Sequence, residues 1–492
     1  MKHNILVCRG TLNHITPYHI KKIMHDVCIN RIYVVVGYIE QIEFYRSYAY
    51  CMLREDCIVG KYEKYVNELD LKIKPLDFES INKVRSFILD IMMTQRRFEE
   101  RIPLYLSSNL IDHYRLALEH ICFWNAFLDE QKIDTVIFSD VPHEAYDNVM
   151  YELCKLKGVK TILYRSFFKT DRYFVMDSYE NMANIVSERL KTCKQNYFEN
   201  DERDIQLSPS VESFYIALKS NKHRSLLFRE ETLRDNEFKY RFGEKNLLQF
   251  VRQKWVYRKR LKYHKNIAEE FGVRNRYREN LFEYIREYAF ILKKRKSTKS
   301  FVRQYRCLAE KPVNDEKYVY YAMHLLPECA VAPLGGSFSD QYLAIKMLSY
   351  CVPKEWKVYV KIHPAQVDVM LSINEIEKYK LLGNVRIVDE DTNQFELIKN
   401  SMAVATLTGE IAVEALMLDK PSFIFGYTYY AVAPLAFRVE TEDELLKALD
   451  EIQRGNFTCS ETDKKIYFKA LEESTVEGME NVLSEIIKKI NQ

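Results

Sequence analysis

Two apolar, β-branched segments that stop abruptly at polar residues constrain the fold of this chain most. Residues 358–364 read Val-Tyr-Val-Lys-Ile-His-Pro, and residues 405–416 read Ala-Thr-Leu-Thr-Gly-Glu-Ile-Ala-Val-Glu-Ala-Leu. Each predicts a buried strand of an open α/β sheet whose polar end lies at the carboxyl edge, where ligands bind. A helix that begins there directs its first N–H groups toward anions. Two such ends in one domain predict a phosphate-binding site.

Predicted strands and helices alternate in two parts of the chain, residues 1–180 and 313–460. In the first part the predicted strands are 5–8, 31–37, 135–139 and 159–164, with a helix at 144–157. In the second part the predicted strands are 317–323, 356–362, 384–388, 402–407 and 421–425, and the predicted helices are 338–350, 373–380, 393–400 and 409–418. Short joints between strand, helix and strand indicate parallel crossover units. A chain of 492 residues suits two such lobes, so we expect an α/β fold with two Rossmann-type lobes.

The remaining segments are predicted to be helical. Residues 78–131 form a long amphipathic stretch inside the first lobe. Residues 181–312 are charged, rich in Tyr and Phe, and without a convincing strand, which predicts a helical insertion between the lobes. Residues 462–490 carry apolar side chains at helical spacing, so the C-terminal region, 461–492, is predicted to be helical.

The net charge of +3 hides one strongly basic segment. Residues 252–306 contain eighteen Lys or Arg and five Asp or Glu, interleaved with aromatic residues such as Trp255 and Tyr263. A solvated helical surface is one interpretation. Attachment to an anionic membrane surface is the other, because clustered Lys and Arg bind such surfaces. No motif of a nucleic-acid-binding fold accompanies the cluster, so no nucleic-acid partner is expected.

The sequence shows no signal for export or for membrane spanning. The N-terminal apolar run covers only four residues, which is too short for a signal peptide. No stretch approaches the ~20 apolar residues of a spanning helix. Eleven cysteines are scattered singly, without a Cys-x-x-Cys pair, which is typical of reduced thiols. We therefore expect a cytoplasmic protein, and any membrane contact should be peripheral and on the inner face.

Short motifs in the second lobe carry a family resemblance. They are His363-Pro364 after a strand, Thr408-Gly409, Glu414-Ala-Leu, Lys420-Pro421 and Phe425-Gly426. This series resembles the C-terminal half of bacterial capsular polysaccharide biosynthesis proteins, a family that includes Kdo transferases and is similar in layout to sialyl- and polysialyltransferases of the GT-B fold. The resemblance is most specific over 315–430, with weaker echoes at 142–144 and 171–178.

The resemblance implies a GT-B-like arrangement in which a C-terminal helix crosses back to the first lobe. It also implies a glycosyltransferase of surface polysaccharide synthesis. The donor would be a nucleotide sugar, with CMP-Kdo or a related CMP-sugar favoured over a UDP-sugar, and the acceptor would be a glycan or a lipid-linked oligosaccharide. No cofactor besides the donor substrate is expected.

Residues around the His-Pro motif are candidate donor ligands. His363 at a strand end can donate a hydrogen bond to a phosphate oxygen, and Pro364 fixes the turn that follows. Lys361 lies on the same side of the strand and can add a positive charge. In the resembled family a Gln near the start of the first helix of this lobe faces the donor, which makes Gln341 and Ser339 further candidates. A helix cap explains Ser339 equally well.

Four residues around the second strand end are also candidate donor ligands. Thr408 can donate through its hydroxyl, and Gly409 lets the backbone approach a phosphate. Glu410 and Glu414 lie one helical turn apart, and a carboxylate there can bind the ribose hydroxyls of a nucleotide. Exposed helix surface is the alternative for Glu410. The apolar neighbours of Glu414 predict a partly buried carboxylate that requires a partner.

The acceptor side is predicted at the end of a strand in the first lobe. Glycosyl transfer needs a group that accepts the proton of the acceptor hydroxyl, and Asp140, His143 and Glu144 follow the strand at 135–139. Pro-His-Glu also matches the resembled family. Polysialyltransferases carry an acidic pair and Gly after the next strand, whereas this chain reads Tyr-Arg-Ser at 164–166, so the identity of the base stays open.

Asp389-Glu390-Asp391 is the only Asp-x-Asp triplet. Such a triplet could hold the metal of the other major glycosyltransferase fold, but capping of the next helix by Asp391 is favoured, so a metal-independent reaction is predicted.

Two other functions stay open. A nucleotide-sugar 2-epimerase shares the architecture and the His-Pro motif, although that family reads Ser-Gly-Gly-x-Gln-Glu-Glu where this chain has residues 408–414. A non-catalytic scaffold that kept the fold is the second.

Overall fold

The structure is a computed structural model. It describes residues 2–8, 16–74, 110–167, 170–197, 201–220, 246–271, 281–326, 328–368, 371–455 and 459–492, together with positions 79, 82, 84 and 239. The predicted amphipathic stretch at 78–131 is therefore described mainly by helix α6 (Leu110–Glu130), and most of 78–109 lies outside the described residues.

The first lobe is built on a seven-stranded sheet in the order β13-β6-β5-β4-β1-β2-β3. Its strands are β1 (His3–Cys8), β2 (Ile29–Val36), β3 (Tyr50–Leu53), β4 (Thr135–Phe138), β5 (Lys160–Ser166), β6 (Arg172–Met176) and β13 (Val476–Glu477). Strands β1 to β5 pair in parallel, and β6 is antiparallel to β5. The helices of this lobe are α1 (Pro17–Asp26), α2 (Ile39–Tyr45), α3 (Arg54–Ile58), α4 (Glu63–Leu69), α6 and α7 (Tyr146–Lys157). The strand order reverses between β1 and β4, as in a Rossmann fold.

The second lobe has a six-stranded, all-parallel sheet in the order β12-β11-β10-β7-β8-β9. Its strands are β7 (Tyr318–Ala322), β8 (Lys357–Lys361), β9 (Val385–Ile387), β10 (Ala403–Thr406), β11 (Ser422–Ile424) and β12 (Ala436–Arg438). Its helices are α15 (Gln341–Cys351), α16 (Ile373–Lys380), α17 (Gln394–Asn400), α18 (Ile411–Leu416) and α19 (Glu442–Arg454), with 3₁₀ turns η3 (Gly336–Phe338) and η4 (Tyr429–Val432). The order reverses between β7 and β10, so this lobe is also Rossmann-type.

Side chains of alternating residues on β7 fill two cores, one on each face of the second sheet. Val319 and Tyr321 belong to the cluster under α15, α16 and α19, whereas Tyr318 and Tyr320 belong to the cluster under α17 and α18. This alternation follows from the two-residue period of a strand. The predicted α/β class with two Rossmann-type lobes is confirmed.

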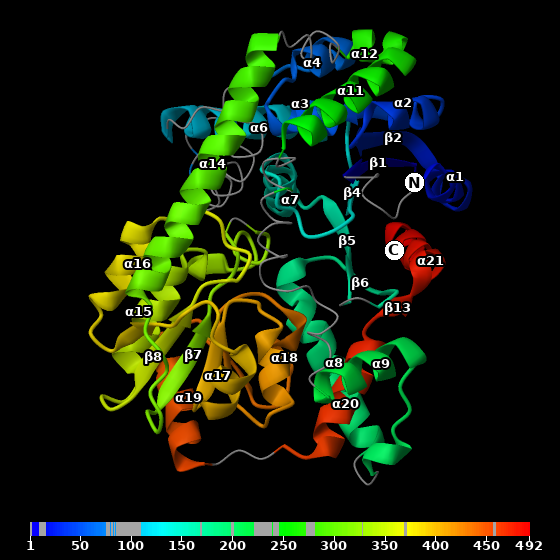
Figure 1. The fold of residues 1–492 in the computed structure, drawn as a ribbon. Coiled ribbons are helices and arrows are strands. Elements are labelled where there is room, and N and C mark those ends of the chain that lie inside the picture. Colours follow the sequence, from blue (N-terminus) through cyan, green and yellow to red (C-terminus); the bar gives the residue numbers. More distant parts are fainter. Residues whose placement is uncertain are drawn as a thin grey trace.

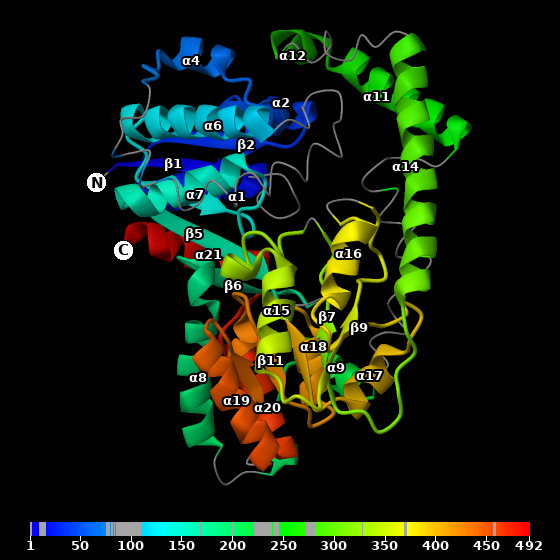
Figure 2. The ribbon, with the colours of Figure 1, turned by 90° about the vertical axis from the view of Figure 1, so that its left-hand side faces the viewer.

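Within 181–312 the described residues are helical and contain no strand, as predicted. The elements are η1 (Tyr179–Asn181), α8 (Met182–Asn196), η2 (Glu202–Asp204), α9 (Pro209–Lys219), α11 (Leu247–Tyr263), α12 (Lys265–Glu270) and α14 (Leu281–Leu308). They do not form one compact body. Helices α8 and α9 pack against α20 (Glu461–Glu473), while α11 and α12 lie beside the first lobe and α14 descends from them to α16 in the second lobe (Figures 1 and 2).

The C-terminal region crosses back to the first lobe, which confirms the predicted arrangement. After α20 the chain forms β13, which pairs antiparallel with β6, and then α21 (Gly478–Asn491), which packs against β5, β6 and α1. The expectation of one uninterrupted helical segment over 462–490 is wrong, because β13 separates two helices. Gly478, with φ of +74°, makes the turn into α21.

The two lobes also share a hydrophobic core. Ala412, Ile424 and Tyr429 of the second lobe belong to the same cluster of buried side chains as Ile5 and Phe174 of the first lobe. None of the helices in the described part of the chain is long and apolar enough to cross a lipid bilayer.

Arg172 on β6 binds the C-terminal segment that crosses back to the first lobe. Its guanidinium donates to Thr475 Oγ1 at 3.0 Å, to the carbonyl oxygens of Glu472 and Thr475 at 2.9 and 3.0 Å, and to Glu477 Oε2 at 2.8 Å.

We expect Arg172→Ala to lower the free energy of unfolding by about 1–3 kcal/mol, because these largely buried acceptors lose their donor. Arg203→Ala is the matched control, since Arg203 is exposed and its ion pair among the described residues is with nearby Asp201. Equal urea midpoints for the two variants would contradict this role.

Candidate functional site

Three adjacent strands of the second sheet end at polar residues, two of which were predicted to bind the donor. Strand β7 lies between β10 and β8, and the reversal of strand order falls between β7 and β10. His324 follows β7, His363 follows β8, and Thr408 follows β10. The fold therefore gathers these three residues at one edge, where open α/β sheets bind ligands.

His324 was not among the predicted site residues, yet it occupies the centre of this edge. Its Nε2 accepts a hydrogen bond from the Thr408 N–H at 3.0 Å and lies 3.0 Å from Thr406 Oγ1. Burial, and secondarily the nearby His363, lower the pKa of His324 to about 3, so the ring is neutral near pH 7. Because Nε2 is an acceptor, the proton of the neutral ring is on Nδ1. The only sequence signal for His324 is its position just after a predicted strand.

Gln341 holds His324 in place. The Gln341 side chain accepts from the His324 N–H at 2.8 Å and donates to the His324 carbonyl oxygen at 3.2 Å. Ser339, the other second candidate near this helix, donates to the carbonyl oxygens of Val331 and Gly336 at 3.0 and 2.8 Å. Both side chains are buried and support the loop, whereas a direct contact with a donor stays a prediction.

The His-Pro turn also fixes the tautomer of His363. Its Nδ1 accepts a hydrogen bond from the Ala365 N–H at 3.1 Å, which leaves the proton of a neutral ring on Nε2. Pro364 occupies the turn, which is closed by a 2.9 Å bond from the Gln366 N–H to the His363 carbonyl oxygen. Lys361 is buried, and its Nζ donates to the Thr392 carbonyl oxygen at 2.5 Å. Its charge therefore lies against the loop before α17.

The backbone between β10 and α18 is tightly packed. Gly409 donates to Thr406 Oγ1 at 3.1 Å, and a Cβ atom at Gly409 would lie 2.5 Å from that oxygen. Only glycine fits there without displacing Thr406. The Thr408 hydroxyl donates to the Ala330 carbonyl oxygen at 3.0 Å. The N–H groups of Thr408 and Gly409 thus both have protein acceptors in this structure, and a phosphate contact with them stays a prediction.

The two predicted carboxylates of α18 have different surroundings. Glu414 is half-buried and accepts a hydrogen bond from Gln394 Nε2 at 3.0 Å, so it has the partner that its apolar neighbours require. Glu410 is exposed and precedes the first residue of α18. Of the two, only Glu410 lines the cavity described next.

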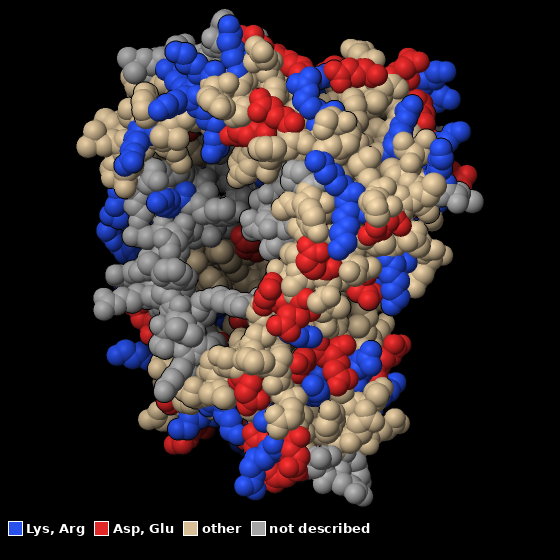
Figure 3. Space-filling view, turned by 90° about the vertical axis from the view of Figure 1, so that its right-hand side faces the viewer, with Lys and Arg blue, Asp and Glu red and all other residues tan. Residues whose placement is uncertain are grey.

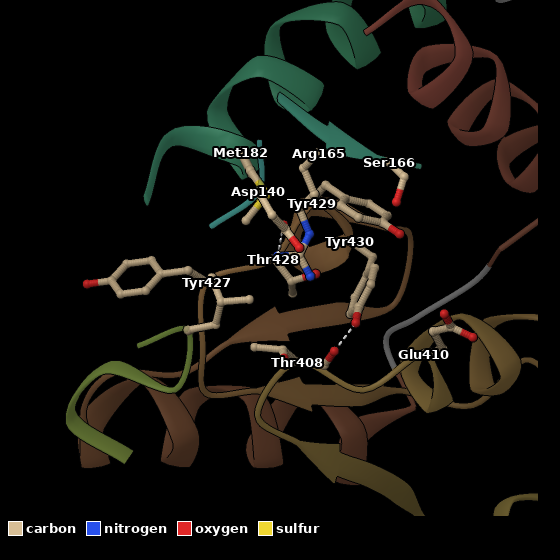
Figure 4. A pocket seen from close by; sticks show the side chains of 11 residues that line it. Asp140, Arg165, Ser166, Met182, Thr408, Glu410, Tyr427, Thr428, Tyr429 and Tyr430 are labelled. Carbon is tan, nitrogen blue, oxygen red and sulfur yellow. Dashed lines mark hydrogen bonds and ion pairs between the residues drawn. The ribbon is translucent and has the colours of Figure 1, made fainter. Parts of the chain in front are cut away.

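A cavity of about 240 Å³ lies between the two lobes (Figure 4). The first lobe contributes Asp140, Arg165 and Ser166, helix α8 contributes Met182, and the second lobe contributes Leu334, Thr408, Glu410, Tyr427, Thr428, Tyr429 and Tyr430. Ligand pockets commonly hold about 300–1,000 Å³, so this one suits a sugar ring or a phosphate group better than a whole nucleotide sugar.

Asp140 and Arg165 form an ion pair at the first-lobe side of this cavity. Arg165 Nη1 lies 3.4 Å from Asp140 Oδ1, which also accepts from the Val141 N–H at 2.7 Å. Burial is the largest single effect and opposes the charge of Arg165, but Asp140, Cys329 and Tyr429 together outweigh it and raise the pKa of the guanidinium above its ordinary value. Arg165 is the only basic side chain among the described residues that line the cavity.

His143 and Glu144 do not line the cavity. His143 is buried, with Nδ1 2.6 Å from the Val141 carbonyl oxygen. Glu144 is 3% exposed and forms a two-point ion pair with Arg54, in which Arg54 Nε lies 2.5 Å from Oε2. A carboxylate bound in this way is stabilised in its charged form. Of the three predicted proton acceptors, only Asp140 reaches the interlobe cavity.

Tyrosines from the loop after β11 form the second-lobe side of the cavity. Tyr430 donates its hydroxyl to the Thr408 carbonyl oxygen (Figure 4), and Tyr429 stacks on Phe174 of the first lobe with ring centroids 5.0 Å apart. Burial raises the pKa of both phenols above the ordinary value, so both remain neutral. These tyrosines were not among the predicted site residues, although they follow the Phe425-Gly426 motif at a strand end.

The acidic triplet at 389–391 attaches α14 to the second lobe. Arg306 of α14 lies 2.8 Å from Glu390 Oε1 and 2.9 Å from Asp391 Oδ2. The expectation that Asp391 caps the next helix is wrong, because the Asn393 side chain accepts the hydrogen bond from the Phe395 N–H at 2.9 Å. Among the described residues, no group of three or more His, Cys, Asp or Glu side chains is placed to hold a metal ion. Metal independence of the reaction stays a prediction.

The family model for capsule polysaccharide biosynthesis proteins matches residues 275–450. This match confirms the resemblance predicted over 315–430. A search of curated proteins finds no match.

Solved structures with a similar layout include two enzyme classes. The β-Kdo 2,7 transferase KpsC of Thermosulfurimonas dismutans is 11% identical, with a TM-score of 0.31, over 80% of this chain and 94% of that chain. The UDP-GlcNAc 2-epimerase of Methanocaldococcus jannaschii is 11% identical, with a TM-score of 0.27, over 96% of this chain and 98% of that chain. Similarity at this level does not distinguish a transferase from an epimerase.

The depressed pKa of His324 predicts a pH dependence of stability. The unfolded chain binds a proton near pH 6.5, whereas the folded chain binds it near pH 3, so acidification through this window favours unfolding. His120, which is fully buried beside the Tyr62 hydroxyl, has a pKa lowered to about 3 and acts in the same direction. Above about pH 6.5 neither group contributes a pH dependence.

Urea unfolding at about pH 7 and about pH 5 tests this linkage. His324→Gln keeps an acceptor for the Thr408 N–H but cannot be protonated, so its loss of stability on acidification should be smaller than that of the wild type. His120→Gln should act likewise, and the double variant should show the smallest loss. The same loss in all four proteins would contradict the assignment.

Proposed function

We propose, from the family match over residues 275–450 and the interlobe cavity, that this chain is a glycosyltransferase of bacterial surface polysaccharide synthesis. It would transfer a sugar from a nucleotide donor to a glycan or glycolipid acceptor. The observation that carries the proposal is a carboxylate of one lobe, Asp140, that faces the donor edge of the other lobe across a shared cavity. A group-transfer reaction requires its two substrates to meet at such a place.

The donor nucleotide would bind at the ends of β7, β8 and β10. His324 carries an N–H proton on Nδ1 and His363 carries one on Nε2, because the other ring nitrogen of each accepts a hydrogen bond, and imidazole N–H groups are suitable donors to phosphate oxygens. Glu414 would bind the ribose hydroxyls, with Gln394 holding its carboxylate. A CMP-sugar such as CMP-Kdo is the favoured donor, and this choice rests on the family alone.

The sugar and the leaving phosphate would occupy the cavity beside Arg165. The leaving group gains negative charge as the glycosidic carbon to phosphate oxygen bond breaks, and the fixed guanidinium stabilises that charge. The same cation can bind the carboxylate that a Kdo-type sugar carries.

Asp140 would accept the proton of the acceptor hydroxyl. Its Oδ1 is held by Arg165 and by the Val141 N–H, whereas Oδ2 makes no hydrogen bond within the described part of the chain. The carboxylate is thus oriented with one oxygen available to the acceptor. As the acceptor oxygen bonds to the sugar, its proton moves to Asp140 and the nucleotide phosphate departs.

Asp140→Asn should lower turnover by about 10²–10⁴-fold, because the amide cannot accept the proton, while nucleotide binding is kept. Release of CMP from CMP-Kdo in the presence of an acceptor glycan measures turnover. Asp177→Asn is a matched control, since Asp177 is exposed in the same lobe and pairs with Lys489. Wild-type turnover of Asp140→Asn at saturating acceptor would place the base elsewhere.

His363→Ala and Glu414→Ala should each lower transfer by about tenfold to a hundredfold, as expected for lost hydrogen bonds to charged groups worth ~1.5–3 kcal/mol. They should also reduce the stabilisation of the protein by CMP in a thermal-shift assay, because a bound nucleotide stabilises the native state by mass action. Glu375→Ala, in an exposed pair with Lys378, is the control. Unchanged activity of both variants would remove the donor site from this edge.

The same assays separate the two other functions. Interconversion of UDP-sugars without an acceptor identifies an epimerase. Nucleotide binding without turnover on any acceptor identifies a non-catalytic scaffold. Stabilisation by CMP that exceeds stabilisation by UDP and GDP supports the CMP-sugar donor.

A further inference from the structure

Helix α11 exposes an apolar stripe that no other part of the described chain covers. Leu248, Val251 and Trp255 are 84%, 54% and 61% exposed, and they recur at spacings that bring them to one side of the helix. The opposite side is the one that packs, because Phe250 and Leu261 are buried. Three large apolar side chains in a row on the outer side of a helix are not explained by the packing of the protein.

The charges on α11 are all positive. Its seventeen residues include six Lys or Arg and no Asp or Glu. Lys254 and Arg260 pair with Glu287 of α14 and Glu40 of α2, both at 2.5 Å, and so attach the helix to the molecule. Arg258 Cζ lies 4.9 Å from the centroid of the Tyr284 ring of α14, and Arg252, Lys259 and Lys262 are exposed.

These three exposed cations flank the apolar stripe. None of them has a carboxylate partner within the described part of the chain. Lys259 Nζ lies 5.4 Å from the centroid of the Trp255 ring, so charge and apolar surface are contiguous. Figure 3 shows Lys and Arg side chains gathered at the upper left, where α11 and the upper part of α14 lie.

We propose that the outer face of α11 docks on a bilayer that contains anionic lipid. Leu248, Val251 and Trp255 would enter the boundary between headgroups and acyl chains, and Arg252, Lys259 and Lys262 would contact lipid phosphates. Such a helix lies in the interface plane, since buried apolar area and cationic charge both favour binding there. An uncharged or basic partner surface would leave the three cations without counter-charges.

This inference goes beyond the proposed transferase. The sequence predicted membrane binding for the whole basic segment 252–306, whereas the structure limits the proposed contact to the outer face of α11. Helix α14 carries exposed basic residues too, but it packs on α16 and donates to Asp368 through Ser297 and Thr298. Its exposed large apolar residues, Ile285 and Leu292, are seven positions apart, and no other large apolar residue is exposed between them.

Tryptophan fluorescence reports this contact directly. The chain has three Trp residues, and Trp124 and Trp356 are 0% and 2% exposed, so Trp255 is the one that can change its environment on docking. Vesicles of equimolar phosphatidylcholine and phosphatidylglycerol should shift the emission to the blue at about 50 mM salt, and the shift should fall at about 500 mM salt. Trp255→Phe should abolish the shift and keep most of the vesicle binding in a sedimentation assay.

Charge-reversal variants locate the surface. Replacement of Arg252, Lys259 and Lys262 by Glu should reduce sedimentation with these vesicles at least tenfold. Replacement of Lys311, Lys399 and Lys447 by Glu changes the net charge equally, at exposed positions of the second lobe, and should leave most of the binding intact. Asp140→Asn should bind vesicles like the wild type, which separates this inference from the proposed catalysis.

Three results would overturn the proposal. Vesicle binding without a blue shift would place the contact on another surface. Equal binding to pure phosphatidylcholine, or binding that does not depend on salt, would exclude recognition of anionic lipid. Absence of binding at low salt would show that α11 is a solvated face or the contact site of a protein partner.

Discussion

Two sheets whose parallel strands end on one cavity are the constraint on which the rest of this structure depends. A parallel sheet places the polar residues that follow its strands at a single edge. Strands β4 and β5 thereby bring Asp140 and Arg165 together, and strands β7, β8 and β10 bring His324, His363 and Thr408 together. Because the lobes share a hydrophobic core, the two edges meet across a cavity of about 240 Å³ and are not left as separate surfaces.

Contacts that connect the parts of the chain keep the two sheet edges facing each other. Arg172 joins β6 to the C-terminal crossing, and Arg306 joins α14 to the acidic triplet of the second lobe. The aromatic contact of Tyr429 with Phe174 lies at the cavity itself. Polar contacts thus connect the elements away from the cavity. At the cavity, packing of large side chains sets the distance between the candidate site residues of the two lobes.

Much of this architecture could be predicted from the sequence, because each strand of the second lobe up to β11 is an apolar run with a distinct polar end. Residues that depend on distant partners could not be predicted. Glu144 was predicted as a base because it is near Asp140 in the sequence, but its carboxylate is bound by Arg54, ninety positions away. Asn393, and not Asp391, caps α17 because of the local turn geometry. Strand β13 is too short to show a recognisable apolar pattern in the sequence. His324 follows its strand without any neighbouring motif, and its importance appears only when Thr408 and Gln341 lie against it.

A structure determined with CMP bound tests the central claim most directly. We expect the phosphate within hydrogen-bonding distance of His363, at the edge formed by β7, β8 and β10, and beside Arg165 in the cavity. CMP bound only in the first lobe, or at a surface remote from both Arg165 and His363, would contradict the assignment of a donor site shared between the lobes.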